Sequence, residues 1–156
     1  MGVGLLAPVP AILLRSALET CAAQGKVAFG TDAFEMFAKL DQQFGESVPV
    51  LIYPTGQHGD PDGLCTPGFV SYRATYRGTQ QAWKGKHPTP TLRPTATVEG
   101  DQQDSKWALF WEVNDLVRLS KIDRVPVSEL TAEGKKKALP RMFVLHGPML
   151  VTAQFL

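Results

Sequence analysis

Short runs in which large apolar residues alternate with other residues constrain the fold of this chain more than any other feature. In residues 107–113 the apolar members of the alternation are Trp107, Leu109, Trp111 and Val113. Residues 68–76 alternate in the same way and place Tyr72 and Tyr76 on one side. A period of two is typical of β-strands, whose successive side chains point to opposite faces of a sheet. Two strands are therefore predicted here.

Two further apolar runs, at 3–9 and 48–53, are bounded by prolines and are also predicted as strands. Short, irregularly spaced strands with few helices favour an α+β fold over alternating β-α-β units. The expected architecture is a small mixed β-barrel with helices packed at its side. With 156 residues and a hydrophobic content of 44%, the chain is expected to form one domain over residues 1–156.

Two segments have the three- and four-residue apolar spacing of helices. The first covers 11–23, and Gly25 is expected to stop it. In the second, Thr31 is expected to cap the helix and Gly45 to end it. Its apolar residues are Phe34, Phe37, Leu40 and Phe44. The second helix is therefore predicted to bury Phe34, Phe37 and Leu40 together in the core.

The segment 78–104 is rich in proline and threonine and is predicted to be a long irregular loop. Loops of that length in compact domains are often functional or mobile. The segment includes Trp83 and His87.

Charge is unevenly distributed along the chain, whose net charge is +1. Residues 1–69 have three basic and seven acidic side chains, a net charge of −4, whereas residues 70–156 have thirteen and eight, a net charge of +5. Such an asymmetry suggests a basic face that could meet phosphate, although charges scattered over a solvated surface would give the same count. Two isolated cysteines, no basic leader and no long apolar run indicate a cytoplasmic protein outside the membrane.

The chain carries none of the common sequence signatures of catalysis. It lacks the Gly-x-Ser-x-Gly elbow, the phosphate-binding loop and the dinucleotide fingerprint. The segment 58–63 is predicted to be a polar turn, since no acidic residue follows at calcium-loop spacing. His87 and His146 have no carboxylate beside them in sequence. No catalytic residue, metal site or cofactor is therefore predicted.

Several motifs together resemble those of an EVE domain, a family of PUA-like barrels. A strand led by Trp107, a Pro-Val-x-x-Leu turn at 126–130 and two final strands over 141–152 are similar to the end of that domain. The segments 28–33, 50–55 and 68–72 resemble its earlier elements, with Phe29 in place of the family's tryptophan. The Arg-Leu-Ser of the family's last motif is missing. The resemblance implies a PUA-like barrel that binds nucleic acid and often holds a modified base in an aromatic pocket.

The resemblance also implies a set of base-pocket residues. Phe29, Tyr53, Tyr72 and Trp111 would stack on the base, while Thr55 and Ser71 would bond to its edge. The alternative is that these aromatic residues belong to the core or pack at the rim of the barrel.

Basic residues flank or lie within the predicted loop, with Trp83 among them, and are candidates for phosphate contact: Arg73, Arg77, Lys84, Lys86 and Arg93. A solvated loop would account for any one of them. The expected function is non-enzymatic binding of nucleic acid, DNA or RNA, with recognition of a modified base. The alternatives are a small hydrolase on the same barrel and a barrel that binds a small molecule or a protein.

Overall fold

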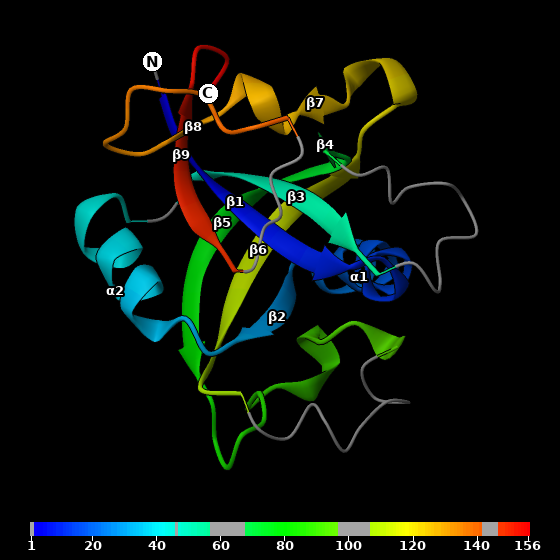
Figure 1. The fold of residues 1–156 in the computed structure, drawn as a ribbon. Helices are drawn as coiled ribbons and strands as arrows, with labels where there is room; N and C mark the ends of the chain where they lie inside the picture. Colours follow the sequence, from blue (N-terminus) through cyan, green and yellow to red (C-terminus); the bar gives the residue numbers. More distant parts are fainter. Residues whose placement is uncertain (1, 46, 57–67, 97–106, 142–146) are drawn as a thin grey trace.

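The computed structural model describes residues 2–45, 47–56, 68–96, 107–141 and 147–156, and these residues form an α+β fold (Figure 1). Its two helices are α1 (Ala11–Gln24) and α2 (Phe34–Gln43). The large sheet consists of β1 (Gly2–Pro10), β2 (Val27–Thr31), β3 (Pro49–Thr55), β5 (Tyr72–Gln81), β6 (Leu109–Arg118), β8 (Thr131–Ala132) and β9 (Met149–Ala153). The short strands β4 (Phe69–Val70) and β7 (Val125–Pro126) pair with each other.

The strand order of the large sheet is β2-β6-β5-β3-β1-β9-β8. Strands β1 and β3 are parallel, and the other neighbours are antiparallel. The chain passes from β1 to β3 through α1, β2 and α2, which is the long crossover that a parallel pair requires. Within the described residues β2 and β8 are the two edges and do not pair with each other, so no closed barrel is formed there.

The first helix follows the sequence prediction closely. It begins directly after Pro10 and ends where Gly25 takes a φ of 84°, a left-handed conformation that glycine adopts without strain. The second helix lies within the predicted segment, but the prediction that Thr31 caps it was wrong, because Thr31 is the last residue of β2. Its N-cap residue is Ala33, and the hydroxyl of Thr31 accepts a hydrogen bond from the backbone N–H of Ala33 at 3.0 Å.

The prediction that Phe34 joins the core was wrong. Phe37 and Leu40 are fully buried, whereas Phe34 is 57% exposed. At about 100° per residue, Phe34 lies roughly 90° from the middle of the face that Phe37 and Leu40 share. Apolar spacing alone did not show that the buried stripe of α2 is narrow. Phe44 follows the last helical residue and is also partly exposed.

Two apolar clusters lie on opposite sides of the sheet. The larger one joins the sheet to both helices, and its centre is a row of rings in which Phe37 stacks near Trp111 at 5.8 Å and Tyr76 at 6.0 Å between ring centroids. The smaller one lies under the chain that follows β6, where Val127 and Leu130 pack against Leu51 of β3. This chain includes the 3₁₀ turns η3 (Lys121–Asp123) and η4 (Val127–Glu129).

The region expected to be a long loop contains regular structure. Strand β5 continues to Gln81, and a 3₁₀ turn, η1 (Pro90–Leu92), follows further along. Residues 82–96 run back beneath β2 and β6 toward α1 and are called the excursion below (Figure 1). The Pro-Val-x-x-Leu segment at 126–130 contains the turn η4, and β8 follows it.

Candidate functional site

The hairpin tip, residues 83–86, lies at the start of the excursion. The N–H of Trp83 donates to the carbonyl of Lys86 at 2.8 Å, and the N–H of Lys86 donates to the carbonyl of Trp83 at 3.1 Å. The two central residues have positive φ, 53° at Lys84 and 78° at Gly85. This is the pattern of a type I′ turn, which joins two antiparallel strands tightly. The backbone that carries Trp83 and both lysines is therefore fixed by its own hydrogen bonds.

The side chains of the hairpin tip are open to solvent. Trp83 is 68% exposed, and the Nζ of Lys84 lies 4.6 Å from the centroid of its ring. At that distance an ammonium group is attracted to the π face of an indole. Lys86 is exposed as well. The tip thus presents a flat aromatic surface beside two cations.

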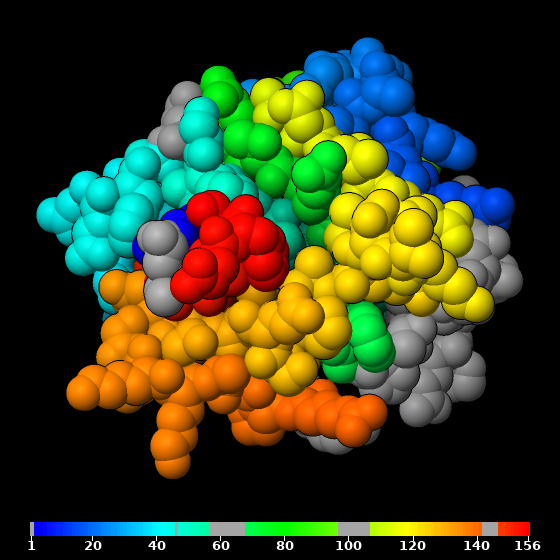
Figure 2. Space-filling model, turned by 90° about the horizontal axis from the view of Figure 1, so that it is seen from above, coloured from blue at the N-terminus to red at the C-terminus, as the bar shows by residue number. Residues whose placement is uncertain are grey.

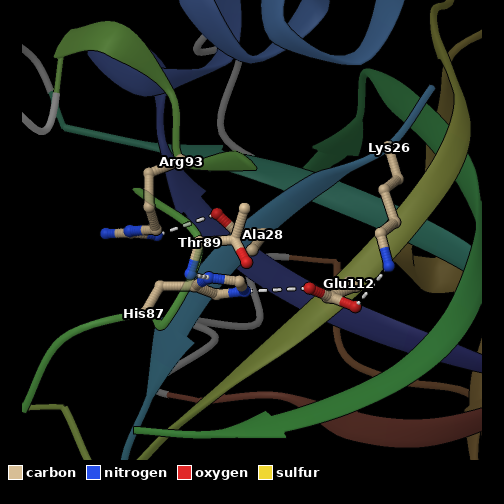
Figure 3. A network of polar contacts seen from close by, with 6 residues as sticks. All are labelled: Lys26, Ala28, His87, Thr89, Arg93 and Glu112. Atoms are coloured by element: carbon tan, nitrogen blue, oxygen red, sulfur yellow. Dashed lines mark hydrogen bonds and ion pairs between the residues drawn. The ribbon is translucent and has the colours of Figure 1, made fainter. Parts of the chain in front are cut away.

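A buried polar network fastens the excursion just after the tip (Figure 3). The Nε2 of His87 lies 2.8 Å from the Oε2 of Glu112 on β6, and the other carboxylate oxygen lies 3.0 Å from the Nζ of Lys26. The backbone N–H of Thr89 donates to the Nδ1 of His87 at 2.8 Å. His87 and Glu112 are both buried. One carboxylate of β6 therefore connects the excursion to Lys26, the residue just before β2.

The bonding of His87 makes it a structural residue. Because Nδ1 accepts a hydrogen bond from a backbone N–H, the ring proton lies on Nε2, which donates it to Glu112. Both ring nitrogens are thus engaged within the protein. A general acid or base needs a nitrogen that faces the substrate. The pair of His87 and Glu112 therefore acts as a clamp on the excursion.

Arg93 provides a second attachment for the excursion. Its Nη1 donates to the carbonyl of Ala28 at 2.8 Å, and its guanidinium lies 4.9 Å from the centroid of Phe110. The ring of His87 also meets Phe110, edge-on, with 5.1 Å between the ring centroids. The hydroxyl of Thr20 on α1 donates to the backbone carbonyl of Arg93 at 3.4 Å. Arg93, proposed from sequence as a phosphate contact, is buried, and its guanidinium is engaged within the protein.

The other proposed phosphate contacts fall into separate places. Lys84 and Lys86 stand together at the hairpin tip. Arg77 is half-buried, and its Nη1 donates to the hydroxyl of Ser47 at 3.2 Å. Arg73 is exposed ten residues before Trp83 along an extended strand, so the two residues are roughly 30 Å apart. The described segment 68–96 nevertheless carries five basic and no acidic side chains.

Three of the proposed base-pocket aromatic residues lie inside the main core: Phe29, Tyr72 and Trp111. The rings of Phe29 and Trp111 are 4.9 Å apart, and Trp111 is only 2% exposed. A base would reach these rings only if the core opened. Ser71 is also fully buried, and its backbone N–H donates to the carbonyl of Ile52.

The remaining two candidates lie on β3. Tyr53 is half-buried, and its hydroxyl accepts a hydrogen bond from the N–H of Gly68 at 3.2 Å. Thr55 is half-buried at the end of the strand. Strand β3 is separated from β2 and β6 by β5. The six candidates therefore do not surround one cavity in the described part of the chain.

Sequence reasoning missed the hairpin tip and the clamp. The signal for the tip was the dipeptide Lys84-Gly85, since a glycine at the second turn position suits a type I′ turn. The clamp had no comparable signal. Glu112 is 25 residues from His87 and 86 from Lys26. Polar pairs so far apart in sequence leave no periodic pattern.

In the part of the chain that the structure describes, no group of three or more His, Cys, Asp or Glu residues is arranged to hold a metal ion. None of the described helices is both long and apolar enough to cross a membrane. No protein-family model matches the chain, and no curated protein or solved structure matches it significantly.

Proposed function

We propose that this protein binds single-stranded nucleic acid, without catalysis, through the hairpin tip. The observation that carries the proposal is the exposed indole of Trp83 with the ammonium of Lys84 on its ring, at the end of an anchored turn. Aromatic side chains on which bases stack, set among cations that meet phosphates, are the usual means of binding single strands.

The geometry of the tip suggests how a nucleotide would bind. Lys84 covers one face of the indole, so a base would stack on the opposite face. The ammonium groups of Lys84 and Lys86 would then lie beside the phosphates of that strand. The lack of acidic side chains in residues 68–96 removes a local source of repulsion.

The clamp contributes by holding the binding surface in place before the ligand arrives. His87 follows the tip directly, and Trp107, whose backbone N–H donates to the carbonyl of Gly85 at 3.3 Å, supports it from the strand side. A side chain that is already positioned loses less entropy on binding. Such a rigid tip would favour contact with any accessible base over selection among bases.

A PUA-like relationship and the recognition of a modified base are finer parts of this proposal. They rest on the sequence motifs, and the described sheet is open between β2 and β8. Base selection by Phe29, Tyr72 and Trp111 would require these buried rings to become accessible. We therefore assign stacking to Trp83 first.

Binding of a labelled single-stranded oligonucleotide, followed by fluorescence anisotropy at low and at rising salt, tests the proposal. Trp83→Ala should weaken binding roughly 5- to 150-fold, the equivalent of one lost stacking contact of about 1–3 kcal/mol. The double change of Lys84 and Lys86 to alanine should lower both the affinity and its salt dependence.

Two matched controls use side chains of the same kind elsewhere on the surface. Phe34→Ala removes an exposed aromatic side chain from α2, and the double change of Lys135 and Lys137 to alanine removes two exposed lysines near β8. Both controls should bind like the wild type. Failure to bind any oligonucleotide at low salt, or equal losses in the hairpin and control variants, would contradict the proposal.

A further inference from the structure

A groove with mixed charge opens at the other end of β5, far from the hairpin tip. It has a volume of about 800 Å³ and lies between β3, β5, β6 and the last two residues of the described chain. Figure 2 looks onto this face, where the C-terminal residues (red) stand beside β5 (green) and β6 (yellow). Cavities that take small molecules usually have volumes of roughly 300–1,000 Å³.

The charged side chains of the groove are of both signs. Arg73 provides a cation from β5, Asp115 an anion from β6, and Asp123 a second anion from η3. Among the described residues, neither the guanidinium of Arg73 nor the carboxylate of Asp115 has a hydrogen-bond or ion-pair partner. Asp123 accepts a hydrogen bond from the hydroxyl of Ser120 at 2.7 Å and keeps its other carboxylate oxygen for a further contact. Two charges of opposite sign are thus available to one ligand.

The backbone is strained where it borders the groove. Asp115 has a φ of 52° and Ser47 a φ of 72°, and both residues line the groove. In β6, Asp115 and Leu116 lie opposite the single residue Ala74, which makes a β-bulge between the pairs Arg73–Val117 and Thr75–Asn114. Bulges redirect side chains and occur often beside binding sites, and strained non-glycine residues cluster there as well. The bulge lies beside the pair Arg73–Val117, and both Asp115 and Arg73 line the groove.

Apolar side chains complete the walls of the groove. Val117 and Phe155 are 42% and 52% exposed, and Leu119 and Val125 lie deeper. A phosphate-rich ligand would meet repulsion from the two carboxylates, and a simple cation would leave Arg73 unpaired. A ligand with one carboxylate, one ammonium group and an apolar body matches all three parts of the lining.

We propose that this groove binds a small zwitterionic molecule with an apolar body, of which a short apolar peptide with free ends is the representative. Arg73 receives the carboxylate, Asp115 and Asp123 receive the ammonium group, and Val117 and Leu119 contact the apolar side chains. This site is independent of nucleic-acid binding at the hairpin tip, because the two lie at opposite ends of β5.

Titration of the ¹⁵N-labelled protein with the dipeptide leucyl-leucine, followed by amide chemical shifts, tests the proposal. Saturable shifts are expected around Arg73 and Val117. Acetylation of the dipeptide's amino end, or amidation of its carboxyl end, should each weaken binding about tenfold, because each removes one charge-assisted contact.

Two variants test which side chain of the groove binds each charged end of the dipeptide. Arg73→Gln should abolish the effect of amidation and leave that of acetylation. Asp115→Asn should reduce the effect of acetylation, because only Asp123 still receives the ammonium group, and should leave that of amidation; asparagine tolerates the left-handed backbone at this position. Arg15→Gln, which removes an exposed arginine from α1, should bind like the wild type.

Four results would overturn the proposal. One is the absence of shifts at millimolar dipeptide, and another is shifts confined to residues outside the groove. The third is equal binding of the free and blocked dipeptides, which would mean that the charges of the groove do not take part. If the groove residues shifted with protein concentration alone, a second copy of the chain would be the occupant instead of a small molecule.

Discussion

The two faces of β6 show two different ways of holding a polypeptide in place. On one face, Trp111 and Val113 pack into the main core with Phe29 and Phe37. The other face meets the excursion, and there Glu112 bonds to side chains from two other segments. Apolar burial is non-directional and accommodates many arrangements of the neighbours. Hydrogen bonds are directional and position their partners individually.

This difference explains how the excursion can be ordered with little apolar core of its own. Of its residues, His87 and Arg93 are buried polar side chains, and both contact Phe110. Their bonds go to a carboxylate and to a backbone carbonyl of the sheet. The apolar face should therefore determine the stability of the whole domain, and the polar face should determine the local order of the hairpin tip.

The largest expected effect on stability comes from a substitution in the apolar face of β6. Trp111→Ala should lower the free energy of unfolding by about 3–5 kcal/mol, since a fully packed indole leaves a cavity. Urea denaturation followed by circular dichroism measures the loss. The control is Trp83→Ala, the same substitution at an exposed position, which should change stability by less than about 0.5 kcal/mol. Similar losses in the two variants would mean that Trp111 is less important to the core than its burial indicates.

A substitution in the polar face of β6 should lower stability less, and its effect should be confined to the hairpin tip. Glu112→Gln replaces one carboxylate oxygen with an NH₂ group, which cannot accept a hydrogen bond. Either the Nε2–H of His87 or the ammonium of Lys26 then loses its acceptor, at an expected cost in stability of about 1–3 kcal/mol. Most of this cost belongs to His87, because Lys26 is partly exposed and screened by water. Hydrogen exchange should rise in residues 83–89 more than in α2.

A surface ion pair provides the control for that measurement. Glu133→Gln removes a carboxylate that lies 3.3 Å from the Nζ of Lys39, both exposed or partly so. Its expected cost is about 0–1 kcal/mol, with no change in exchange at the hairpin tip. If Glu112→Gln left exchange at the tip unchanged as well, the excursion would be held by contacts other than the clamp.

The main core, into which the apolar face of β6 packs, includes Tyr76 of β5, whose hydroxyl makes a polar contact with a defined pH dependence. The hydroxyl of Tyr76 donates to the Oδ1 of Asp41 at 2.5 Å, and burial, together with the nearby carboxylate, raises the pKa of Tyr76 well above its ordinary value of 10.0. The unfolded chain releases this proton near pH 10 and the folded chain does not. The resulting stability is therefore present below that pH and lost as pH rises above it.

Comparison of the wild type with Tyr76→Phe isolates this contribution. At neutral pH the variant should be less stable by about 1 kcal/mol, the usual contribution of one hydrogen bond. Above pH 10 only the wild type loses stability through this residue, so the difference should shrink. Urea midpoints at a series of pH values measure it, and a difference that stayed constant would show that Tyr76 ionises alike in both states.

The sequence predicted the apolar face well and the polar face hardly at all. The alternation that set Trp111 and Val113 opposite Phe110 and Glu112 is a local pattern, and the structure agrees with it. The end of α1 at Gly25 was equally local. The exposure of Phe34 was missed because the spacing of apolar residues does not show how wide a face is covered.

The candidate sites depended on contacts that no local pattern contains. Arg93 lies in a segment of basic residues, yet it is buried and its Nη1 donates to the carbonyl of Ala28. The bulge at Asp115 arises from the pairing of β5 with β6, which places two residues of one strand opposite one of the other. Register and long-range polar pairs are properties of the assembled sheet, so they could not be predicted from the sequence.

The smallest expected effect concerns the turn at the hairpin tip. Lys84 has a φ of 53° at the first central position of a type I′ turn, where asparagine followed by glycine is strongly preferred. Lys84→Asn should therefore stabilise the turn by a few tenths of a kcal/mol while it removes the cation above Trp83. Slower hydrogen exchange at Lys86, whose N–H closes the turn, would show the stabilisation. If the tip binds nucleic acid, this more ordered variant should still bind less tightly, because one phosphate contact is lost. Unchanged or tighter binding would mean that the order of the turn matters and that the charge of Lys84 does not.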